Sequence, residues 1–173
     1  MTFVKLTNTI LGAVNLNSNM DNTLMKLDKE TYTPFMSNYL QSGWMKHICE
    51  ITSVSVDKNN ILAYVDILGY SMPDDGIYHF TADVAFRVVS QLLMIHTGWS
   101  FNCQKKIGES YLREYNSIYN KKINKTCDIK VLGTINEFNV KKDKYAMLNA
   151  TFDIEEGSFV IDISGSIPIA ELP

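Results

Sequence analysis

The sequence has few cysteines, few prolines and no long hydrophobic run. Its three cysteines, Cys49, Cys103 and Cys127, form no Cys-x-x-Cys pair and have no histidine at a zinc-site spacing. This excludes a disulfide scaffold and a zinc site, and it favours a reducing cytoplasm. The longest apolar run is far shorter than the ~20 residues of a membrane-spanning helix, so no membrane span is expected. Asn and Thr interrupt the first 20 residues, which are interpreted as mature protein rather than a signal peptide.

The sequence also lacks an excess of charge of either sign. The formal net charge of the 173 residues is −3, which gives no general attraction for nucleic acid, so an anionic partner must meet a local basic patch. One such cluster follows the apolar middle of the chain: Lys105, Lys106, Arg113, Lys121, Lys122 and Lys125. This cluster is either a solvated surface or a binding site for the phosphates of coenzyme A or for an acidic carrier protein. No metal or cofactor motif is found, so no cofactor is expected.

The organisation is that of one domain behind an irregular arm. Residues 1–26 have no strong hydrophobic period and are predicted to be the arm, with one domain over 27–173. Leu27–Trp44 is predicted as a short helix and turn, because Pro34 interrupts or starts it. Lys46–Tyr70 is predicted as a β-hairpin, because β-branched runs flank the polar turn Asp57–Asn60.

A very apolar helix is predicted over 82–97, after a loop at Met72–Gly76. The only polar residues between Ala82 and Met94 are Asp83, Arg87, Ser90 and Gln91. Three of them recur every four residues, so one narrow polar stripe crosses an otherwise apolar cylinder roughly 24 Å long. Such a helix must be covered nearly all round, as a curved sheet would do.

The remaining chain supplies that sheet. An amphipathic helix is predicted near Lys105–Tyr119, followed by strands at Lys125–Val140, Lys144–Ile154 and Ser158–Ile169. Short polar turns make these three strands sequential and antiparallel, and Gly133 is predicted to mark a bulge. The fold class is therefore α+β. The order of two strands, a buried helix and three strands resembles the hot-dog fold, an antiparallel sheet wrapped around a long central helix.

Two short motifs add a family resemblance. His79, Phe80 and Ala82 form an HFxA pattern, and after eight more residues come Gln91 and Leu92. The "LAY" at 62–64 stands upstream at nearly the family's interval. Over roughly residues 27–170 the chain resembles the FcoT-like, or type III, acyl-CoA thioesterases of the hot-dog superfamily. The His-Phe pair is also similar to that of hydroxyacyl dehydratases.

The resemblance implies a site of two tyrosines and two asparagines without an evident nucleophile. Tyr39 matches the first tyrosine, whereas Pro73 stands near the place of the second. Thr81 and Ser90 stand where the family has asparagine, and both keep hydrogen-bonding ability. The resemblance also implies a homodimer or a larger oligomer, with the site at the dimer interface.

The start of the predicted helix offers the chemistry that a thioester needs. Unpaired backbone N–H groups over Thr81–Val84 could hold the developing oxyanion, with Ala82 beside the substrate. His79 could act as the general base or only shape the loop. Thr81 could be a helix cap, a catalytic residue or both. Lys121 and Lys122 are candidate substrate-binding residues.

Several candidates keep two interpretations. Asp83 either pairs with Arg87 four residues on or is the acid–base partner of His79. Ser90 and Gln91 could bind water or substrate, or satisfy polar groups in the core. His47 and His96 are expected to be packing or surface residues. The side chains of Phe86, Val89, Leu93 and Trp99 line either an acyl tunnel or the core.

The function expected from these features is hydrolysis of a fatty acyl thioester, carried by coenzyme A or by an acyl carrier protein. The first alternative is a dehydratase or isomerase of 3-hydroxyacyl thioesters that uses His79 and Asp83. The second alternative is a binding or assembly protein that keeps the fold without catalysis.

Overall fold

The structure is a computed structural model that describes residues 47–170. The predicted arm at 1–26, the predicted helix at 27–44 and Tyr39 lie outside the described residues. The elements in chain order are β1 (Ile48–Val56), β2 (Asn60–Gly69), α3 (Ala82–Ser100), β3 (Tyr111–Tyr119), β4 (Ile129–Lys141), β5 (Tyr145–Ile154) and β6 (Phe159–Pro168).

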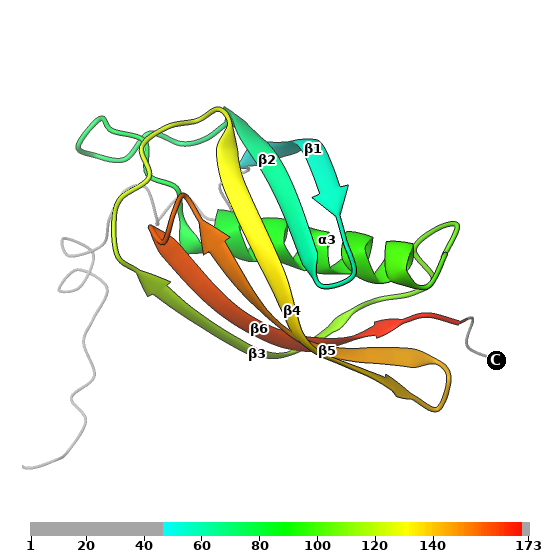
Figure 1. Ribbon diagram of the computed structural model, residues 1–173. Coiled ribbons are helices and arrows are strands. Elements are labelled where there is room, and N and C mark those ends of the chain that lie inside the picture. Colours follow the sequence, from blue (N-terminus) through cyan, green and yellow to red (C-terminus); the bar gives the residue numbers. More distant parts are fainter. Residues whose placement is uncertain (1–46, 171–173) are drawn as a thin grey trace, which may run out of the picture. The chain divides into compact units, whose positions relative to one another are not determined.

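The strands form one antiparallel sheet in the order β1-β2-β4-β5-β6-β3. The helix α3 lies along one face of this sheet (Figure 1). The predicted α+β class, hairpin, helix and three sequential strands are confirmed. A large antiparallel sheet with one helix is also what a hot-dog fold requires.

The core lies between α3 and the sheet. Strand β2 buries alternate residues, Ile61, Ala63, Val65 and Ile67, and β5 and β6 alternate as predicted. The helix faces them with a buried apolar set: Val84, Ala85, Val88, Val89, Leu92 and Leu93. Each large aliphatic side chain in such a core stabilises the fold by about 1.5–3 kcal/mol relative to an exposed position. Burial on this scale fixes the position of the helix start.

The amphipathic helix predicted near Lys105–Tyr119 is wrong, because Tyr111–Tyr119 is strand β3, paired with β6. The reason is a bulge between Leu112 and Glu114, where the pairing register shifts. Leu112 pairs with Gly165 and Tyr115 with Ile163, so these two residues share a sheet face although they are three apart. The bulge thus gives a strand the i, i+3 spacing of a helix.

The bulge predicted at Gly133 is also wrong. Gly133 pairs regularly with Ile61 and Phe152, and the irregularity in β4 falls between Ile135 and Glu137. The glycine instead permits close packing, because a Cβ atom there would overlap the Phe152 ring and lie 2.8 Å from the Ile61 side chain. Gly133 is therefore a packing residue of the core.

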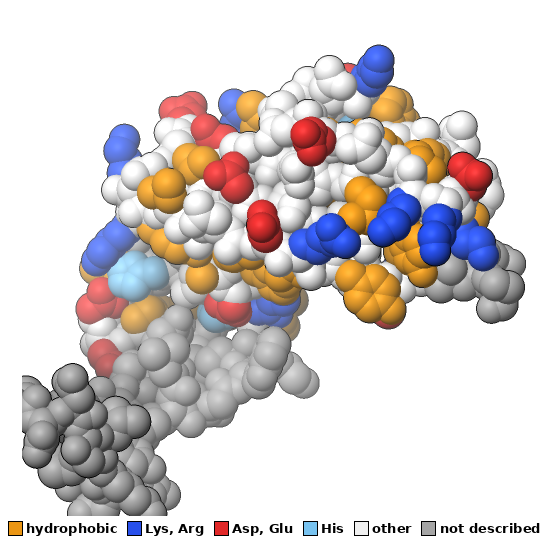
Figure 2. Space-filling model, turned by 90° about the horizontal axis from the view of Figure 1, so that it is seen from below, with side chains coloured by type: hydrophobic (Ala, Val, Ile, Leu, Met, Phe, Trp, Pro, Cys, Tyr) orange, Lys and Arg blue, Asp and Glu red, His pale blue; other side chains and the backbone are white. Residues whose placement is uncertain are grey.

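Strand β3 is one edge of the sheet and exposes apolar side chains. Tyr111 is 62% exposed and Ile118 53% exposed, and Leu112 and Tyr119 are also exposed. On the face seen in Figure 2, hydrophobic side chains gather beside Lys and Arg side chains. No helix within residues 47–170 combines the length and hydropathy that crossing a membrane requires.

Candidate active site

The loop before α3 holds His79 between two side chains. Its Nε2 atom lies 2.8 Å from Asp75 Oδ2, and its Nδ1 atom lies 3.2 Å from Asn124 Oδ1. A carboxylate can only accept, so Nε2 carries a proton and donates it to Asp75. Backbone bonding supports the arrangement, because the Phe80 N–H donates to the Ile123 carbonyl at 2.9 Å. Both ring nitrogens of His79 therefore have partners.

Asp75 is kept as a carboxylate by its hydrogen bonds. The Ile77 N–H and then the His79 ring donate to it, and together they lower the pKa of Asp75 below its ordinary value. A carboxylate that accepts the Nε2 proton fixes the orientation of the imidazole and stabilises its charged form. Asp75 is thus a positioning residue for His79.

The first turn of α3 has no side-chain cap. Thr81 occupies the N-cap position, but its hydroxyl donates to the Asp83 carboxylate instead of accepting from a backbone N–H. The first intrahelical bond runs from the Ala85 N–H to the Thr81 carbonyl. The N–H groups of residues 82–84 precede that bond and have no partner within the helix.

A cavity of about 410 Å³ opens at this helix end, and we call it the mouth cavity. It brings together five of the predicted site residues: His79, Thr81, Ala82, Lys121 and Lys122. Tyr119 and Phe159 form an apolar wall, with their rings 4.4 Å apart in a T-shaped arrangement. Two lysines, a histidine and a helix N-terminus make the surroundings of this cavity attractive to an anion.

Asp83 points into a different cluster. Its Oδ2 atom lies 2.9 Å from Arg87 Nη2, which confirms the predicted pair, and 3.1 Å from Nδ1 of the buried His47. Burial opposes the charge of Asp83, but hydrogen bonds from Thr81, His47 and Arg87 outweigh it and lower the Asp83 pKa. Asp83 and His79 therefore have different partners in this chain.

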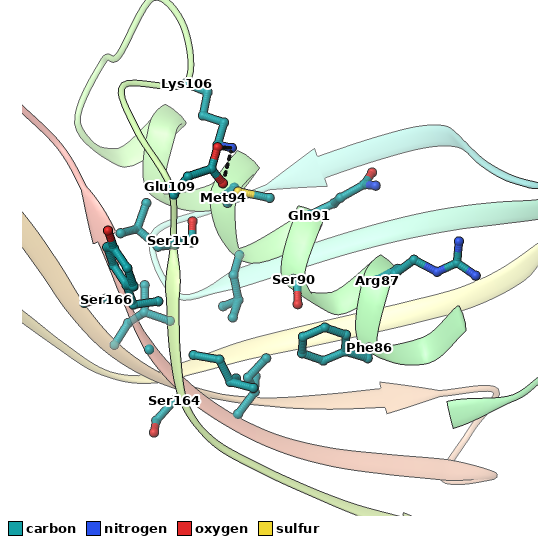
Figure 3. Close-up of a pocket in the computed structure, with 17 residues that line it drawn as sticks. Phe86, Arg87, Ser90, Gln91, Met94, Lys106, Glu109, Ser110, Ser164 and Ser166 are labelled. Atoms are coloured by element: carbon teal, nitrogen blue, oxygen red, sulfur yellow. Dashed lines mark hydrogen bonds and ion pairs between the residues drawn. The ribbon is translucent and has the colours of Figure 1, made fainter. Parts of the chain in front are cut away.

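Ser90 and Gln91 lie farther along α3, at a second cavity of about 300 Å³ that we call the inner cavity. It lies between α3, β6 and residues 106–112. Figure 3 shows Ser90 and Phe86 directed from the helix toward the strands, while the side chains of Arg87 and Gln91 extend to the side. The mouth cavity and the inner cavity therefore share the predicted site residues of the described part of the chain, except Asp83, which lines neither.

The contacts of the remaining candidate residues distinguish structural roles from possible binding roles. His96 is buried, with Nε2 3.0 Å from the Asp57 carbonyl oxygen, as expected of a packing histidine. In the basic cluster, Lys106 pairs with Glu109 and Lys125 with Glu155, each at 2.8 Å, whereas Lys121 and Lys122 form no direct ion pair among the described residues. Within residues 47–170, no group of three or more His, Cys, Asp or Glu side chains converges into a metal site.

Three residues of this region were not predicted from the sequence. Asp75 could have been found from its i, i+4 spacing to His79, but Asn124 has no local signal because it is 45 residues away. Tyr115 was hidden by the wrong helix at 105–119. Its hydroxyl is buried, and burial, followed by the neighbouring Tyr119 phenol, raises the Tyr115 pKa.

Comparison with known proteins gives distant structural likeness only. No protein-family model matches the chain, and no curated protein matches it in sequence. A thioesterase from Haemophilus influenzae is similar at 14% identity over 85% of this chain and 95% of that chain, with a TM-score of 0.47. A hypothetical thioesterase from Streptococcus pneumoniae, solved with coenzyme A, is similar at 12% identity over 76% of this chain and 100% of that chain, with a TM-score of 0.43.

A dehydratase heterocomplex from Xenorhabdus doucetiae is similar at 13% identity over 68% of this chain and 81% of that chain, with a TM-score of 0.47. Likeness at this level carries no argument about function. The resemblance to the FcoT-like family therefore stays a prediction, and function has to be argued from the geometry of the two cavities.

Proposed function

We propose that this protein hydrolyses fatty acyl thioesters, carried by coenzyme A or by an acyl carrier protein. The observation that supports the proposal is the uncapped N-terminus of α3, which opens on the mouth cavity beside His79. A carbonyl oxygen bound there would meet the backbone N–H groups of residues 82–84. These groups and about half a positive charge from the helix dipole stabilise an oxyanion.

Stabilisation of the oxyanion is the largest contribution in this proposal. A thioester is already activated, so the protein has to hold the developing negative charge and orient a water molecule. Loss of one such donor typically raises the barrier by roughly 3–4 kcal/mol. Here the donors belong to the backbone of a buried helix and need no rearrangement during the reaction.

His79 orients and activates the water in this proposal. Nε2 donates to Asp75, and Nδ1 faces the amide oxygen of Asn124 at 3.2 Å, which can also only accept. In this proposal the amide of Asn124 turns aside, and Nδ1 without a proton then accepts from water. Proton transfer from water to Nδ1 then places a positive imidazole next to the Asp75 carboxylate, which stabilises it.

Lys121 and Lys122 bind the carrier. They line the mouth cavity and form no direct ion pair with a carboxylate among residues 47–170, although the charge of Lys122 contributes to the lowered pKa of Asp75, so both ammonium groups can contact phosphate. Coenzyme A and the prosthetic arm of a carrier protein both present phosphate, and the lysines recognise that shared group. Three free cysteines agree with the reducing cytoplasm proposed for this reaction.

A second copy of the chain completes the site in this proposal. Strand β3 is a sheet edge with exposed Tyr111, Leu112, Ile118 and Tyr119, so a partner strand could pair with it and cover these side chains. The inner cavity, with Ser90 and Gln91, reaches this same edge through Tyr111 and Leu112. A homodimer joined at β3 would bring Ser90 and Gln91 of one copy toward the mouth cavity of the other.

One observation favours a second candidate, an acyl-thioester binding protein without turnover. Both ring nitrogens of His79 have oxygen partners, so neither is free to act as a base in this arrangement. The dehydratase alternative gains no such support, because Asp83 pairs with His47, Arg87 and Thr81 instead of His79 within the chain.

Release of free thiol from a panel of acyl-coenzyme A thioesters tests the proposal. Hydrolysis predicts turnover by the wild type and a loss of about 100-fold or more in His79→Ala, the range of general base catalysis. Thr81→Ala should lose less, because its hydroxyl bonds Asp83 rather than the substrate site. The protein could instead bind thioesters of both coenzyme A and the carrier protein and release thiol from neither. That outcome would refute hydrolysis and support the binding function.

A further inference from the structure

The inner cavity continues into a third cavity of about 390 Å³, which we call the end cavity. Four residues line both cavities: Gln91, Met94, Lys106 and Ile167. Shared walls on the helix, on β6 and on the intervening loop mean that the two cavities adjoin. Met94 is the apolar helix residue at their junction, and Figure 3 shows it between Gln91 and Glu109.

Together the two cavities are long and mainly apolar. They follow α3 from Phe86 to Trp99, a rise of roughly 20 Å along the helix axis. The inner cavity alone follows the helix from Phe86 to Met94, roughly 12 Å. Its walls include Leu93, Leu148 and Ile163. Its polar groups are four serine hydroxyls, the Tyr111 phenol and the side chains of Arg87, Gln91, Lys106 and Glu109. A mainly apolar passage of this length fits an unbranched hydrocarbon chain.

A glycine inside the helix keeps the end cavity open. Gly98 lines that cavity, and a Cβ atom placed on it would meet nothing within 4 Å. Glycine in a helix interior is less stable than alanine, so the packing of the protein alone does not favour it here. Beside it Trp99 is 51% exposed and Ile95 39% exposed, although both are large apolar residues that line the same cavity.

We propose that the inner and end cavities form one slot for the acyl chain and that Met94 sets the chain length that it accepts. The inference rests on the proposed function, which supplies an acyl thioester as ligand, and on the proposed homodimer, which brings the inner cavity of one copy toward the mouth cavity of the other. An extended chain advances by about 1.2 Å per bond, so the inner cavity holds roughly ten bonds and both cavities roughly sixteen. Methionine is flexible and can turn aside to admit the longer chain.

Variants on α3 test the slot with butyryl-, octanoyl-, dodecanoyl- and palmitoyl-coenzyme A. Gly98→Leu fills the end cavity and should lower kcat/KM for palmitoyl at least tenfold, with less than a twofold change for octanoyl. Met94→Ala should raise the palmitoyl-to-octanoyl ratio of kcat/KM about threefold or more. Ser100→Leu adds the same side chain as Gly98→Leu at an exposed position that lines neither cavity, so it should keep the wild-type profile.

Calorimetric binding of the corresponding non-hydrolysable thioether analogues separates the slot from the reaction. If no thioester is hydrolysed but Gly98→Leu weakens the binding of only the palmitoyl analogue, the slot is supported and hydrolysis is refuted. If Gly98→Leu and the wild type hydrolyse thioesters with the same chain-length profile, the slot is refuted and hydrolysis is supported. Absence of binding by every analogue would overturn the slot as well.

Discussion

The Nε2 atom of His79 lies 2.8 Å from Oδ2 of Asp75, four residues earlier in the chain. This contact ties the loop before α3 to the histidine at the helix start. It also decides which ring nitrogen is left to act as a base. The role of Asp75 is therefore open to a direct test.

Asp75→Asn should lower kcat of the thioester reaction about 10- to 100-fold with little change in KM, because the amide no longer stabilises a charged imidazole. Steady-state kinetics of wild type and Asp75→Asn with the same thioester would measure both kcat and KM.

Asp74→Asn is the matched control for this change. Asp74 is the neighbouring exposed carboxylate and has no hydrogen bond or ion pair within the described residues. An equal loss of kcat in both variants would mean that the loop, rather than the contact with His79, is responsible.

Reversing the charges of Lys121 and Lys122 should weaken binding of coenzyme A thioesters. The double change to Glu places two negative charges in the wall of the mouth cavity, where the phosphates are proposed to bind. KM should rise at least tenfold while kcat changes little, and the effect should shrink at high salt because the interaction is screened. The double variant Lys141→Glu with Lys142→Glu, at the turn between β4 and β5, should keep the wild-type KM.

Asp83→Asn should destabilise the fold in a pH-dependent way. The pKa of Asp83 is lowered in the folded state, so its contribution is present above the unfolded pKa of about 3.9 and is lost as pH falls through the folded pKa. The side chain is 49% exposed, so the loss near pH 7 should be only about 0.5–1 kcal/mol.

Urea unfolding at pH 7 and pH 3 would measure the difference between wild type and Asp83→Asn. The difference should be smaller at the lower pH, because the contribution of the wild-type carboxylate is lost as the pH falls through its lowered folded-state pKa. A difference that stays constant from pH 7 to pH 3 would contradict the assigned role of the charge.

Gly133→Ala should destabilise the fold by about 1–3 kcal/mol, because the new methyl group would overlap the ring of Phe152 in a packed core. Gly98→Ala is the matched comparison, since the space above Gly98 is open. It should be stabilising by up to about 1 kcal/mol. Thermal or urea unfolding of both variants would check the opposite signs.

The regular elements were largely predictable from the sequence, because each has one dominant period. The alternating apolar residues of β5 and β6 fit only a strand, and the nearly continuous apolar sequence of α3 fits only a buried helix. Strand β3 was not predictable, because its bulge makes Leu112 and Tyr115 share a face three residues apart. A tertiary pairing with β6 decides its conformation, and no local pattern records that pairing.

The site was predictable only in part. His79, Thr81 and Ala82 are neighbours in sequence, and they do line one cavity with Lys121 and Lys122. The partners of the charged groups were less accessible: His47 contacts Asp83 across 36 residues, and Asn124 contacts His79 across 45. Such contacts depend on how the loops cross the helix end, which hydrophobic periodicity does not encode.

The place of β3 at the sheet edge has a consequence for synthesis of the chain. Its described pairing partner is β6, which leaves the ribosome well after β3 does. At ~5–20 residues per second, β3 would wait for several seconds with its apolar side chains exposed. During that interval the wall that β3 gives to the inner cavity is missing, so ligand could assist folding only after β6 has been made.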